Sequence, residues 1–217
     1  YFIPDHYENP NDNRYFVWFI FRDSRNILWI GTSDGLFTFD EETNFFKRFV
    51  FPASDESFYN SKTTCICEDD QGFLWIGSQS NELICFDPET HFFDKIKLPS
   101  TGIPRSITKI NSNVIWICYN FDNIWKIDRH RSNFYNIKEL GPNMISDITT
   151  DSENNILFSF YIGSLYRGKI NVSKFNSEIV SEFEDKLIFR ISLDTENNFW
   201  ITCRKDENFQ IVILDNS

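Results

Sequence analysis

Two stretches decide the fold of this chain: "DSRNILWIGTSDGLFTFD", residues 23–40, and "DDQGFLWIGSQSNELICFD", residues 69–87. Each stretch begins with an acidic residue and a polar turn, and then enters an apolar run that contains Leu-Trp-Ile-Gly. A second turn leads to another apolar run. Two copies of one such unit indicate an array of repeats, because a single unit cannot bury its own apolar surface.

The repeat extends through the chain when the units are aligned on the Leu-Trp pair. The aligned positions, which lie 41 to 46 residues apart, are Trp29, Trp75, Trp116, Leu157 and Trp200. Each of the five units has three apolar runs separated by turns, and most have a fourth, such as "NFFKRF" and "HFFDKI". Four short strands in about 40 residues are typical of a β-propeller blade.

The second run of each unit supports this interpretation. Consecutive apolar residues such as "ILWI", residues 27–30, require both faces of the strand to be covered, as they are between two neighbouring blades. Asp34-Gly35 favours a tight hairpin, and no helical periodicity of useful length is present. We therefore predict an all-β chain, a β-propeller with about five four-stranded antiparallel blades.

We expect residues 1–217 to form a single propeller region. The predicted blade units are residues 15–58, 59–103, 104–142, 143–184 and 185–217, with residues 1–14 an outer strand of a preceding or closing blade. The last unit ends after its third apolar run. The sequence fits either part of a larger propeller or a small ring that the N-terminal strand closes.

The first two units also carry a family resemblance. The pattern "D-x-x-x-x-LWIGT-x-x-GL-x-x-[FY]D-x-x-T-x-x-F", from Asp23 to Phe46 and more loosely from Asp69 to Phe93, resembles the two-component regulator propeller repeat. This repeat occurs in the sensor regions of Bacteroides-type hybrid two-component histidine kinases. The resemblance implies a periplasmic region of an inner-membrane sensor protein, joined to further propeller blades and signalling domains, and we expect the chain to be an excerpt of a longer precursor.

The net charge limits the classes of binding partner that we expect, and the positions of the cysteines indicate their redox state. The 21 basic and 32 acidic residues give a net charge of −11, which opposes binding to nucleic acid or to an anionic membrane surface. No run of eighteen apolar residues is present. The five cysteines lie in apolar strand-like runs, so we expect buried free thiols, with one disulfide from Cys65 or Cys67 to Cys85 as the alternative.

The sequence contains no recognisable catalytic, metal or cofactor motif. Four aspartates, Asp23, Asp69, Asp151 and Asp194, recur at one place in their repeats, which favours a turn-capping role over catalysis. The three histidines, His6, His91 and His130, are scattered without metal-ligand spacing. We therefore predict no catalytic residues, no metal site and no cofactor. We also predict that Trp29, Trp75, Trp116 and Trp200 are buried between blades.

A ligand is expected at the residues that break the repeat on one rim of the propeller. The third unit diverges most there, with "CYNFDN" at residues 118–123. Aromatic rings can stack on a sugar while amide, carboxylate and guanidinium groups bind its hydroxyls. The predicted ligand-binding residues are Tyr59, Arg105, Tyr119, Asn120 and Asp122.

The leading functional hypothesis is a non-enzymatic sensor module that responds to an oligosaccharide, with the signalling role taken from the family resemblance. The acidic chain favours a neutral over a sulfated ligand. Two alternatives stay open: a glycan-active enzyme built on a propeller, and a protein-interaction scaffold. A homodimer is compatible with the sequence.

Overall fold

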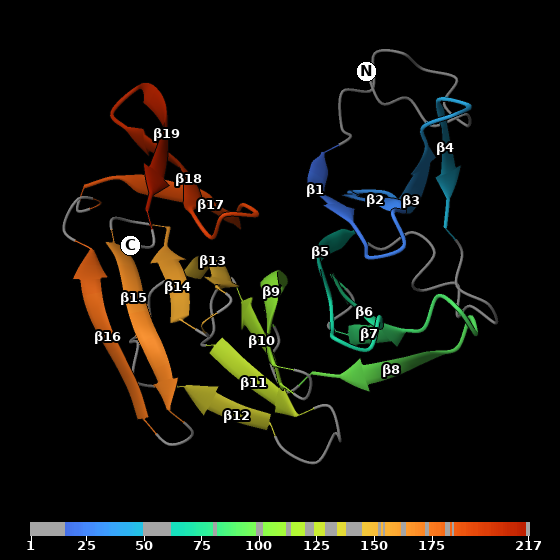
Figure 1. Cartoon of the computed structure of the whole chain (residues 1–217), viewed down its shortest axis with the longest axis horizontal. Coiled ribbons are helices and arrows are strands. Elements are labelled where there is room, and N and C mark those ends of the chain that lie inside the picture. The colour runs from blue at the N-terminus through green and yellow to red at the C-terminus, as the bar shows by residue number, and fades with distance from the viewer. Residues whose placement is uncertain are drawn as a thin grey trace. The chain divides into compact units, whose positions relative to one another are not determined.

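The computed structural model describes residues 16–49, 62–79, 82–98, 102–111, 114–119, 124–128, 134–137, 145–151, 153, 155–161, 164–171, 174–180, 183 and 185–215. These residues form nineteen β-strands and no α-helix. The strands make five antiparallel sheets, each built from consecutive strands (Figure 1). The predicted all-β propeller class is confirmed, and we call the sheets blades 1 to 5.

Blades 1 and 2 belong to the first of two compact units, residues 1–98. Blade 1 consists of β1 (Val17–Arg22), β2 (Leu28–Thr32), β3 (Gly35–Asp40) and β4 (Phe45–Arg48). Blade 2 consists of β5 (Thr63–Glu68), β6 (Leu74–Ser78), β7 (Glu82–Phe86) and β8 (Phe93–Lys97). In both blades each strand pairs with the strands before and after it along the chain.

Blades 3, 4 and 5 belong to the second compact unit, residues 99–217. Blade 3 consists of β9 (Pro104–Asn111), β10 (Val114–Tyr119), β11 (Ile124–Asp128) and β12 (Phe134–Ile137). Blade 4 consists of β13 (Ile145–Thr150), β14 (Asn155–Phe160), β15 (Ser164–Asn171) and β16 (Lys174–Val180). Blade 5 consists of β17 (Leu187–Leu193), β18 (Phe199–Lys205) and β19 (Asn208–Leu214).

One aspartate fixes the first hairpin of blade 1. Asp23 accepts hydrogen bonds at Oδ1 from the backbone N–H groups of Arg25 (3.0 Å) and Ile27 (2.8 Å). Its Oδ2 accepts a third bond, from the indole Nε1–H of Trp29 at 3.0 Å. The carboxylate therefore closes the turn and orients the large side chain that follows it.

The same arrangement recurs along the chain. Asp69 binds Trp75 Nε1 at 2.9 Å, and Asp194 binds Trp200 Nε1 at 2.8 Å. In blade 4, which has Leu157 in place of tryptophan, Asp151 Oδ2 instead accepts a bond from the side-chain amide of Asn155 at 2.6 Å. The predicted turn-capping role of the recurring aspartates is confirmed.

The oriented tryptophan packs against the next blade. Trp29 and Leu36 of blade 1 share an apolar cluster with residues of blade 2, and the Trp29 ring lies 6.3 Å from the ring of Phe86. In the second unit, Trp116 of blade 3 shares a cluster with Ile145 of blade 4. The inter-blade faces are therefore the cores of the two units, as the consecutive apolar residues of the second strands predict.

Leu157 takes the place of the tryptophan in blade 4. It is buried in an apolar cluster with Ile191, Phe199 and Ile201 of blade 5. A branched aliphatic side chain therefore fills the inter-blade position where blades 1 and 3 use an indole.

Blade 5 has three strands among the described residues, in agreement with a last unit that ends after its third apolar run, so β19 has no strand on its outer side there. Trp200 is 41% exposed, whereas Trp29 is 2% exposed. The predicted burial of Trp200 is wrong because its face of blade 5, which also presents Ile211 and Ile213, is not covered by a further described blade.

The predicted free cysteines are confirmed, since all five are buried and none forms a disulfide. The predicted outer strand at residues 1–14 lies outside the described residues. No helix among the described residues is long and apolar enough to cross a membrane.

We predict that replacing the first and the last tryptophan of the repeat, Trp29 and Trp200, by alanine lowers the free energy of unfolding by different amounts. Trp29→Ala should lower the free energy of unfolding by about 3–5 kcal/mol, because it opens a cavity between two blades. Trp200→Ala should cost only about 1–2 kcal/mol, since the ring is already partly in water. Urea unfolding followed by circular dichroism measures both, and equal losses would contradict the inter-blade role.

Candidate functional site

Two of the predicted ligand-binding residues are described, and the structure brings them together. Tyr119, the last residue of β10, pairs with Pro104 at the start of β9, and Arg105 follows directly. The register shifts by one residue here, so Arg105 occupies a β-bulge, a feature that re-aims side chains at the ends of sheets. Arg105 is partly exposed, whereas Tyr119 is fully buried and presents no surface to a ligand.

The other three predicted residues, Tyr59, Asn120 and Asp122, lie outside the described residues. The binding role of the set stays a prediction. Of the two members that the structure describes, only Arg105 has a side chain that a solute can touch.

A polar cluster joins the first strands of blades 3, 4 and 5. Each strand carries one polar residue directly after its bulge: Ser106 on β9, Asp147 on β13 and Arg190 on β17. Ser106 Oγ donates a hydrogen bond to the carbonyl oxygen of Ile148 at 3.1 Å. Asp147 Oδ2 accepts one from the N–H of Ile191 at 2.7 Å, so each contact crosses to the next blade.

Among the described residues, Asp147 is the only one with a carboxyl group whose pKa is raised. Complete burial is the largest cause, and it is opposed by the nearby Arg190 guanidinium, whose Nη1 lies 3.8 Å from Oδ1. A buried acid with a raised pKa is a common sign of catalysis. Here the N–H groups of Ile148 and Ile191 already occupy the two oxygens, which favours a structural role.

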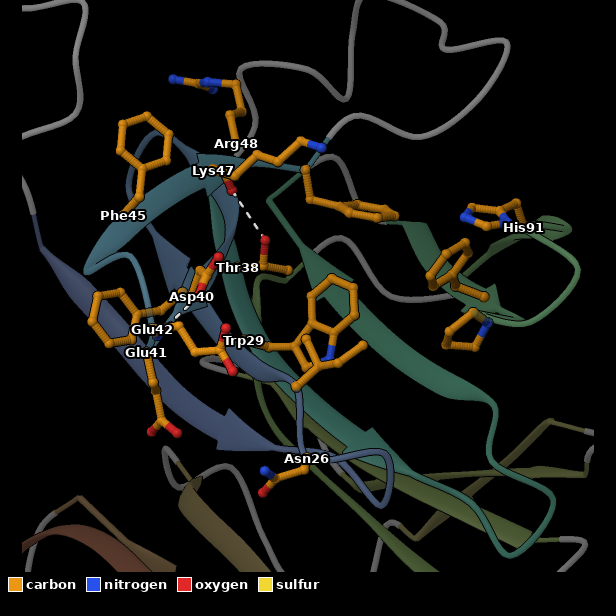
Figure 2. A pocket seen from close by; sticks show the side chains of 15 residues that line it. Asn26, Trp29, Thr38, Asp40, Glu41, Glu42, Phe45, Lys47, Arg48 and His91 are labelled. Atoms are coloured by element: carbon orange, nitrogen blue, oxygen red, sulfur yellow. Dashed lines mark hydrogen bonds between the residues drawn. The ribbon is translucent and has the colours of Figure 1, made fainter.

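A pocket of about 790 Å³ lies between blades 1 and 2, within the first unit. Blade 1 contributes residues of β2, β3 and β4, the turn before β2 and the turn after β3. Blade 2 contributes the end of β7 and the segment that links β7 to β8. Figure 2 shows Thr38, Glu42 and Lys47 on the blade 1 side, His91 on the opposite side and Trp29 at the base. This volume falls within the range of small-molecule sites.

The base of the pocket is aromatic. Trp29, Phe49 and Phe86 pack edge to face, with Phe49 centred 5.0 Å from each of the other two rings. Trp29 and Phe86 are only 2% and 1% exposed, whereas Phe49 is half-buried and Phe45 at the rim is 50% exposed. Phe45 and Phe49 therefore supply the aromatic surface that a ligand could touch.

Three charged groups on the pocket wall are already engaged. Glu41 accepts two hydrogen bonds from Arg22, which lower the pKa of its carboxyl group. Asp40 caps the β3–β4 turn through the N–H groups of residues 42 and 43. Arg48 pairs with Asp34 and lies over the ring of Phe37.

Three polar side chains of the pocket have no ion pair or side-chain hydrogen bond to another part of the described chain. They are Glu42, Lys47 and His91, all of which are exposed. The pocket thus offers one carboxylate, one ammonium group and one imidazole beside the aromatic rings at its bottom. No set of three His, Cys, Asp or Glu side chains in the described ranges is placed to hold a metal ion.

The sequence pattern does not single out the pocket or Asp147. The pocket residues lie in the fourth run of the first unit and in a turn of the second, and neither breaks the repeat. Asp147 had a weak signal, as the one carboxylate inside the apolar run "ISDIT". A charge within a strand that is covered on both faces indicates a specific partner, which here is the next blade.

A family model described as the two component regulator propeller matches residues 59–80, which include β5 and β6. The chain contains the two-component regulator propeller repeat. The resemblance on the Leu-Trp-Ile-Gly stretch is therefore confirmed. No curated protein matches this propeller chain by sequence.

Solved structures share the propeller fold. The extracellular domain of BT3049 from B. thetaiotaomicron, assigned as a hybrid two-component system, superposes with a TM-score of 0.68 at 19% identity, over 93% of this chain and 29% of that domain. The corresponding domain of BT4673 gives 0.61 at 14% identity, over 95% and 34%. This propeller chain thus spans about a third of these domains.

An enzyme also shares the fold. Virginiamycin B lyase from Staphylococcus aureus, as an inactive H270A variant with quinupristin, gives a TM-score of 0.68 at 15% identity, over 94% of this chain and 72% of the lyase. Because all three identities are low, these likenesses establish the architecture alone.

We predict that the contribution of Asp147 to stability depends on pH. Because burial raises its pKa in the folded state, folding favours the protonated acid, and its contribution falls as pH rises through the folded pKa. Relative to Asp147→Asn, the wild type should therefore gain stability as pH is lowered from about 8 to 4. Urea unfolding of both proteins across this range measures the difference, and a difference that is constant or of opposite trend would contradict the prediction.

Proposed function

We propose that this region is a non-enzymatic, extracytoplasmic sensor module of a hybrid two-component system and that it binds a neutral oligosaccharide. The observation that carries the proposal is the two-component regulator propeller repeat at residues 59–80. The similarity in fold to the extracellular domains of BT3049 and BT4673 supports it. The periplasm is the proposed location.

The contacts of the buried carboxylates favour ligand binding over catalysis as the function. The recurring aspartates bind their own turns and indoles, and Asp147 is enclosed by backbone amides, so none of these carboxylates is free to act on a substrate. The net charge of −11 disfavours a sulfated or phosphorylated ligand. Signalling would pass to kinase domains elsewhere in the protein, through further blades or a dimer of sensors.

One observation favours an enzyme as the second candidate. The fold of virginiamycin B lyase, an enzyme that loses activity in an H270A variant, is as similar to this chain as that of BT3049. The described residues of this chain include one histidine, His91, on the outer turn between β7 and β8. The H270A result makes His91 the residue to replace if any activity is found.

We expect the purified chain to bind at least one neutral plant or host oligosaccharide in calorimetric titration, and to bind sulfated ones no better at low salt. Arg105→Ala should weaken the binding by about tenfold if the rim around β9 contributes hydrogen bonds. Lys109→Ala, further along the same strand, is the matched control. Retention of full affinity by Arg105→Ala would place the site elsewhere.

We also expect no turnover of polysaccharides or of quinupristin. Reducing-end assays and chromatography after prolonged incubation measure product formation. Sustained product release that His91→Ala abolishes would instead establish the enzyme.

A further inference from the structure

We propose that the pocket between blades 1 and 2 is a binding site for one neutral pyranose unit of a glycan. The proposal deepens the sensor function and rests on it for the class of ligand, but it concerns a surface far along the sequence from Arg105 and Tyr119. The pocket's volume of about 790 Å³ is too large for an ion and suits a hexose or a disaccharide.

The aromatic surface matches one face of a pyranose ring. Phe49 is held by the rings of Trp29 and Phe86 at 5.0 Å each, so its orientation is fixed before any ligand arrives. A rigid, half-buried ring of this kind can take the C–H face of a sugar at little cost in conformational entropy. Phe45, which is 50% exposed, extends the apolar surface toward the rim.

The polar groups match hydroxyls better than they match an ion. Glu42 can only accept hydrogen bonds and Lys47 can only donate them, whereas a sugar hydroxyl does both. His91 faces them across the pocket and can donate or accept when neutral (Figure 2). One ligand with several hydroxyls can therefore use all three groups together.

Charged ligands fit the pocket less well. An anion that approached Lys47 would also meet Asp40 and Glu42 in the same wall, where Glu41 and Arg48 are already ion-paired with Arg22 and Asp34. A cation that approached Glu42 would meet Lys47. Because both signs line one small space, a neutral ligand with many hydrogen-bonding groups is favoured.

The walls of the pocket are held in place by contacts between the two blades. Glu68 of blade 2 accepts hydrogen bonds from the N–H and hydroxyl of Ser24, at 2.7 and 2.6 Å. Arg25 of blade 1 donates to the carbonyl oxygen of Gly72 at 3.0 Å. A ligand that binds both blades would strengthen this same contact and raise the melting temperature of the chain.

The test uses NMR titration of the isotope-labelled chain with methyl glucoside, methyl galactoside, methyl mannoside and cellobiose up to about 50 mM, a range that suits weak small ligands. We expect at least one probe to shift the resonances of residues 38–49 and 86–91. Glu42→Gln and Lys47→Ala should each weaken that binding by about fivefold or more. Glu196→Gln and Lys97→Ala, which change exposed groups outside the pocket, should leave it unchanged.

The outcomes separate this proposal from the sensor function. If no probe binds, or if a probe binds and neither pocket variant weakens it, the pocket proposal is overturned, while oligosaccharide binding in the calorimetric titration would leave the sensor function standing. A further outcome is that the pocket binds a sugar as expected while the calorimetric titration detects no binding of any oligosaccharide larger than the probes. In that case the pocket proposal stands and the proposed sensor ligand is wrong.

Discussion

The hydrogen bond from a tryptophan indole to an aspartate six residues earlier is the interaction on which the blades depend. In blades 1, 2 and 5 one carboxylate closes the first hairpin and holds the indole at 2.8 to 3.0 Å. Both groups are nearly fully buried in blades 1 and 2, where an unsatisfied partner would be costly. In blade 1 the bond holds the indole on the face that packs against blade 2.

The polar side chains that differ from blade to blade lie at strand ends and turns, outside the repeated apolar core. Near the N-terminal ends of β9, β13 and β17, bulges place three different residues, Ser106, Asp147 and Arg190, at equivalent positions. At the outer side, the pocket between blades 1 and 2 is bordered by a turn residue, His91, and by side chains of β4. The repeat thus provides a common frame, and the positions that differ between blades present different polar groups.

Much of the fold could be predicted from the sequence because the signal is repeated. The spacing of the Leu-Trp pair and the consecutive apolar residues indicate strands covered on both faces, and the recurrence of Asp23 and Asp69 indicates a structural acid. The burial of Trp200 could not be predicted correctly. It depends on whether another blade covers its face, and the local sequence of β18 is the same in either case.

The site was less predictable for a related reason. The aromatic ring and hydroxyl of Tyr119 are of the kind that contacts a ligand, but its position at the end of β10 places the ring in the interior. Glu42 and Lys47 look like ordinary surface residues in the sequence. They matter only because Arg22 and Asp34 engage their charged neighbours Glu41 and Arg48, and because a different blade brings His91 to face them. Such facts depend on tertiary packing, which single-sequence patterns do not encode.

The recurring aspartates hold the first hairpins and the indoles of their blades in place. The direct measurement is the hydrogen-exchange rate of the Trp75 indole N–H in the wild type and in Asp69→Asn, a substitution of equal size that puts an amide donor against the donors of the turn. We predict slow exchange in the wild type, at least about tenfold faster exchange in the variant, and lower stability. Unchanged exchange and stability, together with loss of ligand binding or of a catalytic activity, would contradict the structural role and make the aspartate a functional residue.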